Sequence, residues 1–290
     1  MTRPITALSQ IAAGYDALLC DLWGCLHNGH APYPAAVAAL QAFRRGGGRV
    51  VLLTNAPRPW TSVTRHLDRM GVPKDAYDLV VSSGDATQEA MLAGLAGRRV
   101  HHIGAPKDDS FFTEAAPAEA LATITRVPLS EAEGIICTGL ADDLTETPED
   151  YAATLHAAHG LGLTMLCANP DIVVDYGDKR LWCAGALARD YEAMGGRALY
   201  FGKPHAPAYD LARRRLADLG CAADRLLAVG DGIDTDVRGG LAEGIDTIYV
   251  SGGINATDFG PDPLAPDPGR LQDWLAARQI TPTYTLPRLG

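Results

Sequence analysis

Residues 226–236 read LLAVGDGIDTD, an apolar run that leads directly into three aspartates. A continuous apolar run of this kind is typical of a parallel β-strand that is covered on both faces. Carboxylates crowded at one strand end repel one another unless a cation offsets them. Because magnesium prefers oxygen ligands, the stretch predicts a metal site formed by Asp231 and its neighbours. A solvated acidic loop is the alternative interpretation.

Two other apolar runs end in polar residues that suit the same chemistry. Asp21 directly follows Ala17–Cys20, and Thr54 and Asn55 directly follow Val50–Leu53. Ligands of α/β proteins bind at the carboxyl ends of parallel strands, so we expect these side chains to meet at one edge of a sheet. Taken singly, each position also fits an ordinary turn or helix cap.

A lysine follows a further apolar run. Lys203 lies in Gly202-Lys203-Pro204, directly after Ala198–Phe201. A lone lysine is usually a solvated surface residue, but here it is also the cation expected to offset the aspartates and a bound phosphate. The segment is not a phosphate-binding P-loop, because Pro204 stands where that motif needs Ser or Thr.

The rest of the chain alternates apolar runs with amphipathic, alanine-rich segments, which predicts an open, doubly wound α/β sheet. The expected strands are Ala17–Cys20, Arg49–Leu53, Leu79–Val81, Arg99–Ile103, Gly134–Cys137, Leu163–Cys167, Ala198–Phe201, Leu226–Val229 and Thr247–Val250. These are too many for one simple sheet of ordinary size. We therefore expect a second α/β unit between about Gln88 and Arg197.

The composition disfavours several classes of partner. The 290 residues carry a formal net charge of −10 with Lys and Arg scattered along the chain, which disfavours nucleic acid. No apolar run reaches the roughly 18 residues needed to span a bilayer, and Met1–Ala13 lacks the pattern of a signal peptide. The six cysteines form no C-x-x-C pair. We therefore expect reduced thiols in a cytoplasmic protein that binds neither a membrane nor nucleic acid.

From about Tyr15 to Gly253, the order of these segments resembles the four motifs of the haloacid dehalogenase (HAD) superfamily. Within it, the sequence is similar to class IIA, whose members carry a C2-type cap domain and include 4-nitrophenyl phosphatase-like and pyridoxal phosphate phosphatase-like enzymes. The segments that carry this likeness are Thr54-Asn55, Ser82–Thr87, Ala168–Asp171, Gly202-Lys203-Pro204, Gly230-Asp231 and Thr235-Asp236. The resemblance implies a Rossmann-like core domain of residues 1–87 and 198–290, with an α/β cap domain of residues 88–197 inserted into it.

The resemblance also implies a catalytic scheme and a cofactor. Asp21 attacks the phosphorus and becomes a transient aspartyl phosphate. Mg²⁺ is held by the carboxylates of Asp21 and Asp231 and by the backbone carbonyl of Trp23. Asp236 contributes directly or through water.

Further residues are implied as phosphate and substrate ligands. Thr54, the Asn55 backbone and Lys203 hold the phosphoryl oxygens and stabilise charge in the transition state. Asn169 and Asp171 match the family's cap motif, so we expect them at the substrate-binding edge of the cap. An ordinary Asn-Pro-Asp turn is the alternative interpretation. Class IIA members often pair through their caps, which makes a homodimer an expectation.

One position departs from the family pattern. Trp23 stands where the family carries a second aspartate, which protonates the leaving group and then activates water. An indole donates a hydrogen bond but does not exchange protons, and losing a general acid–base typically costs about 10²–10⁴-fold in rate. The protein could act on substrates with good leaving groups, such as acyl or aryl phosphates. Another group, with His27 and His205 as candidates, could take over.

We therefore predict a magnesium-dependent phosphatase that acts on a small phosphorylated metabolite. The alternative is a catalytically weak protein that binds a phosphorylated ligand on the same scaffold. A nicotinamide-dependent dehydrogenase is disfavoured, because no G-x-G-x-x-G lies between a strand and a helix near the start of the chain.

Overall fold

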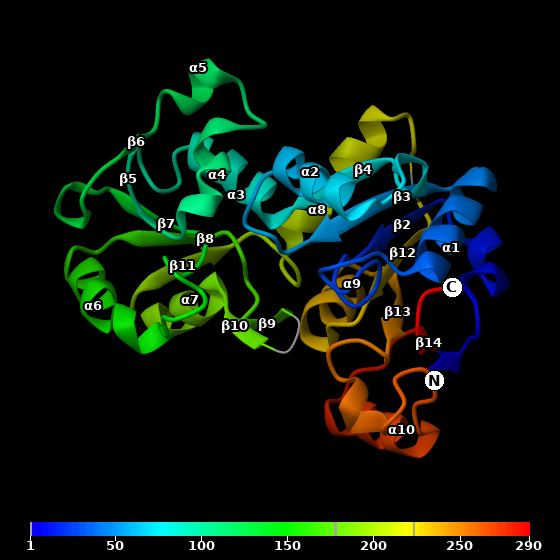
Figure 1. Ribbon diagram of the computed structural model, residues 1–290. Helices are drawn as coiled ribbons and strands as arrows, with labels where there is room; N and C mark the ends of the chain where they lie inside the picture. Colours follow the sequence, from blue (N-terminus) through cyan, green and yellow to red (C-terminus); the bar gives the residue numbers. More distant parts are fainter. Residues whose placement is uncertain (1, 177–178, 223) are drawn as a thin grey trace. The chain divides into compact units, whose positions relative to one another are not determined.

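The computed structural model describes residues 2–176, 179–222 and 224–290, and the chain divides into two units (Figure 1). The first unit consists of Met1–Thr54, His66–Val80 and Tyr209–Gly290, and the second of Asn55–Arg65 and Val81–Ala208. Each unit contains its own sheet of parallel strands with helices. The predicted α/β fold class is therefore confirmed.

The first unit is built on a seven-stranded sheet. Its order is β1-β14-β13-β12-β2-β3-β4, and each pair from β1 to β3 in this order is parallel. The strands are β1 (Arg3–Pro4), β2 (Ala17–Cys20), β3 (Arg49–Thr54), β4 (Leu79–Ser82), β12 (Leu226–Gly230), β13 (Asp246–Val250) and β14 (Tyr284–Leu286). All residues of β2 and β12 are buried, which explains why their sequences show no polar alternation.

The helices of this part of the chain bury one apolar side. They are α1 (Pro34–Arg45), α2 (Trp60–Met70), α8 (Ala206–Asp218), α9 (Arg238–Ala242) and α10 (Pro268–Ala277), and the chain passes from one unit to the other within α2 and α8. Helix α1 has a proline in its first turn and buries Ala36, Leu40 and Phe43, which lie three or four residues apart on one face. In α10, Leu271 and Leu275 pack into a cluster with Tyr249 and Phe259.

The second unit is built on a five-stranded parallel sheet of order β11-β8-β7-β5-β6 and a separate antiparallel pair, β9 with β10. The strands are β5 (Arg99–Ile103), β6 (Thr125–Arg126), β7 (Gly134–Cys137), β8 (Thr164–Cys167), β9 (Val173–Tyr176), β10 (Lys179–Trp182) and β11 (Arg197–Tyr200). The helices are α3 (Ser83–Leu92), α4 (Ser110–Thr113), α5 (Ala118–Leu121), α6 (Ala152–Gly160) and α7 (Ala184–Ala193). The core of this unit joins β7 and β8 to α6 and α7 through side chains such as Met165, Leu155 and Tyr191.

The unit boundaries differ from the predicted domain boundaries. The sequence predicts that Ala198–Phe201 belongs to the core domain, but β11 pairs with β8 in the sheet of the second unit. Residues Asn55–Arg65 also belong to the second unit. The apolar run of β11 suits either sheet, and apolarity alone does not identify the neighbouring strand. Among the described residues, no helix is both long and apolar enough to cross a membrane.

Candidate active site

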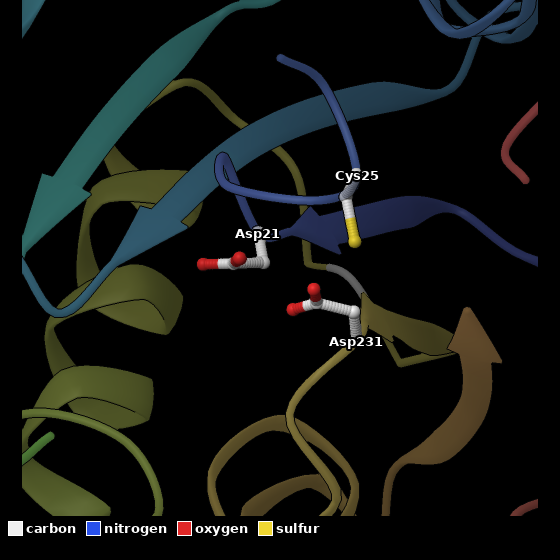
Figure 2. A group of neighbouring side chains, drawn as sticks. All are labelled: Asp21, Cys25 and Asp231. Atoms are coloured by element: carbon white, nitrogen blue, oxygen red, sulfur yellow. The ribbon is translucent and has the colours of Figure 1, made fainter. Parts of the chain in front are cut away.

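Two buried aspartates emerge side by side from the first sheet. Strand β12 pairs with β2 in parallel, with Val229 opposite Cys20, and the Asp21 N–H donates to the Val229 carbonyl at 2.8 Å. Asp21 directly follows β2 and Asp231 directly follows β12, so the two aspartates lie at the carboxyl ends of adjacent strands. Figure 2 shows both carboxylates extending to the same side. One oxygen of each carboxylate and the Cys25 sulfur lie within 4.8 Å of one another.

Close backbone contact fixes the Asp231 carboxylate. The Ile254 N–H donates to Asp231 Oδ2 at 2.8 Å. A Cβ atom on Gly24, whose φ is +68°, would lie 2.0 Å from Asp231 Oδ2, and a Cβ on Gly253 would lie 2.1 Å from the same atom. Both positions therefore require glycine. In the sequence, Gly253 and Ile254 carry no motif that identifies them as partners of Asp231.

The other aspartates of the acidic stretch have different environments. Asp236 is buried in a short π-helix, Ile233–Val237, and accepts a hydrogen bond from the Gly232 N–H at 3.1 Å. Asp234 has a side chain that is 69% exposed and pairs with Arg238 at 2.8 Å. The Asp236 side chain therefore stabilises the turn after β12. Asp234 lies on the surface and forms an ion pair one helical turn along the chain.

The donor atoms around Asp21 and Asp231 fit a hard divalent cation. Burial raises the pKa of the Cys25 thiol well above its usual value, and the neighbouring Asp231 and Asp21 raise it further. The thiol is therefore neutral at physiological pH, and a neutral thiol is a poor ligand for magnesium. The two carboxylates are the ligands that this part of the structure offers, and their mutual repulsion at close range favours a bound cation.

Trp23 is built into the loop that follows Asp21. Its ring lies edge-on to His27, with centroids 5.2 Å apart. A Cβ on Gly29 would lie 2.5 Å from the indole ring, so Trp23 occupies the space over this glycine. His27 is 1% exposed, and its Nδ1 accepts a hydrogen bond from the Gly29 N–H at 3.1 Å.

Burial and, to a smaller extent, the neighbouring His66 lower the pKa of His27 to about 4. His27 is therefore neutral at neutral pH, so it is a weak candidate for the missing acid. Burial also lowers the pKa of His205, which stacks on Tyr200 with ring centroids 4.9 Å apart. A lowered pKa disfavours the imidazolium form of both histidines, which is the form that acts as a general acid.

In the second unit, Asn55 joins two of the other predicted site residues. Its Nδ2 donates to Asp171 Oδ1 at 2.8 Å and to the Lys203 carbonyl at 2.9 Å, and the Lys203 N–H donates to Asn55 Oδ1 at 2.7 Å. Lys203 is 3% exposed. Asn169 Oδ1 accepts from the Asp171 N–H at 3.0 Å, which is the turn that the sequence leaves open as an alternative. Thr54 is buried at the end of β3.

The segment Ser82–Thr87 anchors the loop that carries Asn55. Ser82 and Asp85 form a reciprocal capping box at the start of α3, with hydrogen bonds of 3.0 and 3.1 Å. The second oxygen of Asp85 accepts from the Trp60 N–H at 2.9 Å, which ties the end of the loop to the same cap. The motif therefore has a structural role in holding residues 55–60.

Comparisons with known proteins agree with this architecture. The family described as haloacid dehalogenase-like hydrolase matches residues 18–116, and a second family, described as HAD-hydrolase-like, matches residues 200–289. The crystal structure of a haloacid dehalogenase-like hydrolase from Brucella suis 1330 is 39% identical, with a TM-score of 0.84 over 99% of this chain and 100% of that one.

Matches to a named phosphatase activity are more distant. D-glycerol 3-phosphate phosphatase of Mycobacterium tuberculosis is 29% identical over 86% of this chain. The matched region spans 66% of that protein's length. The structure of glycerol phosphate phosphatase from Mycobacterium tuberculosis in complex with magnesium is 26% identical, with a TM-score of 0.66 over 95% of this chain and 75% of that one. The likeness covers both units, and the chain belongs to the haloacid dehalogenase-like hydrolase family.

Proposed function

We propose that this protein is a magnesium-dependent phosphatase that acts on a small phosphorylated metabolite through an aspartyl phosphate on Asp21. The observation that carries the proposal is the pair of buried carboxylates, Asp21 and Asp231, at the carboxyl ends of adjacent parallel strands. This edge is where α/β proteins bind ligands. The chain is similar to glycerol phosphate phosphatase of Mycobacterium tuberculosis, which supports a phosphate monoester as the substrate class.

The proposed metal ligands are Asp21, Asp231, the backbone carbonyl of Trp23 and, directly or through water, Asp236. A bound Mg²⁺ would neutralise the carboxylates and polarise the phosphoryl group. The Asp231 carboxylate packs closely against Gly24 and Gly253, and the Ile254 N–H donates to one of its oxygens. This preorganisation supports the assignment, since a ligand that is already oriented loses less entropy on binding.

In the proposed reaction, a carboxylate oxygen of Asp21 attacks the phosphorus, and the bond from phosphorus to the leaving-group oxygen breaks. Water then attacks the phosphorus of the aspartyl phosphate, which releases inorganic phosphate and restores Asp21. Thr54, Asn55 and Lys203 are proposed to hold the phosphoryl oxygens. Because the Asn55 side chain is already bonded to Asp171 and Lys203, its contribution would come from its backbone N–H.

Trp23 is proposed to restrict the substrates. With an indole in place of the second aspartate and with His27 neutral, a leaving group that needs no protonation would be released fastest. Aryl and acyl phosphates are of this kind. The second candidate function, binding of a phosphorylated ligand without turnover, is favoured by the same observation. The two candidates differ in whether any phosphate is released.

The test is the magnesium-dependent release of phosphate from aryl, acyl and sugar phosphates. We expect turnover by the wild type and its loss in Asp21→Asn, with Asp234→Asn as the matched control because Asp234 is exposed and pairs with Arg238. Wild-type protein that binds Mg²⁺ and a phosphorylated ligand but releases no phosphate would support the binding function instead.

The proposed compartment is the cytoplasm, because all six cysteines are free thiols. We also propose that the first unit acts as the core domain and the second as the cap domain. A homodimer would form through the cap.

A further inference from the structure

Arg58 and Asp108 form a polar pair in the second unit that the proposed chemistry does not use. Arg58 Nε lies 3.8 Å from Asp108 Oδ1. The Arg58 side chain is 33% exposed, whereas that of Asp108 is 4% exposed. Burying a carboxylate costs free energy unless a partner offsets its lost hydration. The buried Asp108 carboxylate therefore depends on the nearby positive charge of Arg58.

The loop that carries Arg58 is fixed against the start of α3. The Gly84 N–H donates to the Ala56 carbonyl at 3.0 Å. A Cβ on Gly84 would lie 2.3 Å from the Pro57 carbonyl oxygen, so helix and loop approach as closely as only glycine allows. The same loop carries Asn55, one of the proposed phosphate-binding residues. Arg58 therefore extends from a preorganised backbone, which is what a ligand-binding side chain requires.

Other polar groups fix the position of the Asp108 side chain. The Thr138 hydroxyl hydrogen-bonds to the Asp108 carboxylate, and His102 Nε2 lies 2.9 Å from Thr138 Oγ1. Burial raises the pKa of Asp108, and Arg58 opposes this shift. Asp108 Oδ1 has no hydrogen-bond donor within the part of the chain that the structure describes. The separation of 3.8 Å from Arg58 is too long for a hydrogen bond, so the pair interacts as charges. This contact leaves the N–H donors of Arg58 available as far as residues 2–176, 179–222 and 224–290 are concerned.

We propose that Arg58 binds a pair of oxygen atoms on the leaving group of the substrate and that Asp108 positions Arg58. A guanidinium presents its N–H donors in a planar fork, which matches a carboxylate or two neighbouring hydroxyl groups. Asp108 and Thr138 follow β5 and β7, at the carboxyl edge of the same parallel sheet from which Lys203 follows β11. That edge is where ligands of α/β proteins bind. The inference rests on the proposed function, because it concerns the substrate of the same reaction.

The test compares three phosphate esters with Arg58→Gln and Asp108→Asn. Phenyl phosphate lacks the oxygen pair, 4-carboxyphenyl phosphate adds a carboxylate to the same ring, and glycerol 3-phosphate offers neighbouring hydroxyl groups. We expect Arg58→Gln to lower kcat/KM about 10- to 100-fold for one of the two oxygen-bearing substrates, the range for losing a charge-assisted hydrogen bond. The rate with phenyl phosphate should stay within about 3-fold. The substrate that loses activity identifies the source of the oxygen pair.

For Asp108→Asn, we expect a higher KM for that same substrate with an unchanged kcat, and Arg58→Lys should restore part of the loss in Arg58→Gln. The matched control is Asp109→Asn, because Asp109 is exposed and pairs with Arg126. An equal loss for all three esters would contradict the inference, since Arg58 would then act on the shared phosphoryl group or on the fold. No change for any ester would also contradict it. Wild-type protein that hydrolyses none of the esters would refute the proposed function itself.

Discussion

Asn55 and Lys203 hold each other through two hydrogen bonds between one side chain and one backbone. The Lys203 N–H donates to Asn55 Oδ1 at 2.7 Å, and Asn55 Nδ2 donates to the Lys203 carbonyl at 2.9 Å. The two residues are 148 positions apart in the sequence. The backbone around the proposed phosphate-binding lysine is therefore fixed by the residue that directly follows β3.

This relationship predicts that Asn55→Ala displaces Lys203 and leaves buried backbone groups without partners. Each unsatisfied group costs about 1–3 kcal/mol, so we expect a measurable loss in the free energy of unfolding and a fall in kcat/KM. Denaturant unfolding and phosphate-release kinetics measure the two effects. Asn28→Ala is the control, since the Asn28 side chain accepts hydrogen bonds from the His30 and Ala31 N–H groups in an exposed loop. Unchanged kinetics in Asn55→Ala would show that Lys203 does not depend on this contact.

A second prediction concerns the glycine beside Asp231. Gly24→Ala would place a methyl group 2.0 Å from Asp231 Oδ2, so the carboxylate must move away from its position beside Asp21. We expect Mg²⁺ affinity, measured by calorimetric titration, to fall at least about 10-fold, as for the loss of one good ligand interaction. Gly47→Ala is the matched control, because Gly47 also has a positive φ but has nothing within 4 Å of the added atom. Equal Mg²⁺ affinity in both variants would contradict the role of Asp231 as a ligand.

A third prediction concerns Trp23. Trp23→Asp supplies the carboxylate that the family usually carries, so the rate with an alkyl phosphate should rise relative to the rate with an aryl phosphate. The same change empties the space over Gly29 and beside His27, and we expect it to lower the free energy of unfolding by about 1–3 kcal/mol. Trp23→Phe, which keeps a ring but adds no acid, should leave the ratio of the two rates unchanged. A ratio that is the same in all three proteins would show that position 23 does not govern proton transfer.

A fourth prediction concerns pH and His102. Burial lowers the pKa of His102 from 6.5 to about 4, so the unfolded chain binds a proton there more readily than the folded chain does. Above pH 6.5 the imidazole is neutral in both states, so it does not reduce the free energy of unfolding. As pH falls from 6.5 towards 4, the unfolded chain takes up a proton at His102 first, and the free energy of unfolding falls by at most about 3 kcal/mol. Urea unfolding should show a smaller loss over this range in His102→Gln. His156→Gln, at an exposed helix position, should behave as wild type. A pH dependence that His102→Gln leaves unchanged would refute the assignment.

The sequence alone predicts the bounds of several parallel strands in both sheets. The runs Ala17–Cys20, Arg99–Ile103 and Gly134–Cys137 form strands β2, β5 and β7 with those bounds. Buried parallel strands need continuous apolar side chains, and this requirement is visible in one sequence. The adjacency of Asp21 and Asp231 depends in addition on β12 pairing with β2, which the apolar runs alone do not specify.

Other features left no local signal. Tyr284–Leu286 pairs with β13 and β1, although no motif in this part of the sequence identifies a strand of the sheet. Strand β11 was apolar enough for either sheet, so its place beside β8 was not predictable from its own residues. The pair of Arg58 and Asp108 joins two ordinary-looking loops, and only the folded chain brings them together.

The central claim is that Asp21 carries the phosphoryl group during turnover. The most direct measurement is to mix the protein with Mg²⁺ and an aryl phosphate, quench the reaction in acid and reduce it with borohydride, which converts an aspartyl phosphate to homoserine. Peptide mass spectrometry then locates the change. We expect homoserine at position 21 only when substrate was present. Phosphate release by the wild type that continues undiminished in Asp21→Asn, with Asp21 unmodified after the quench, would contradict it.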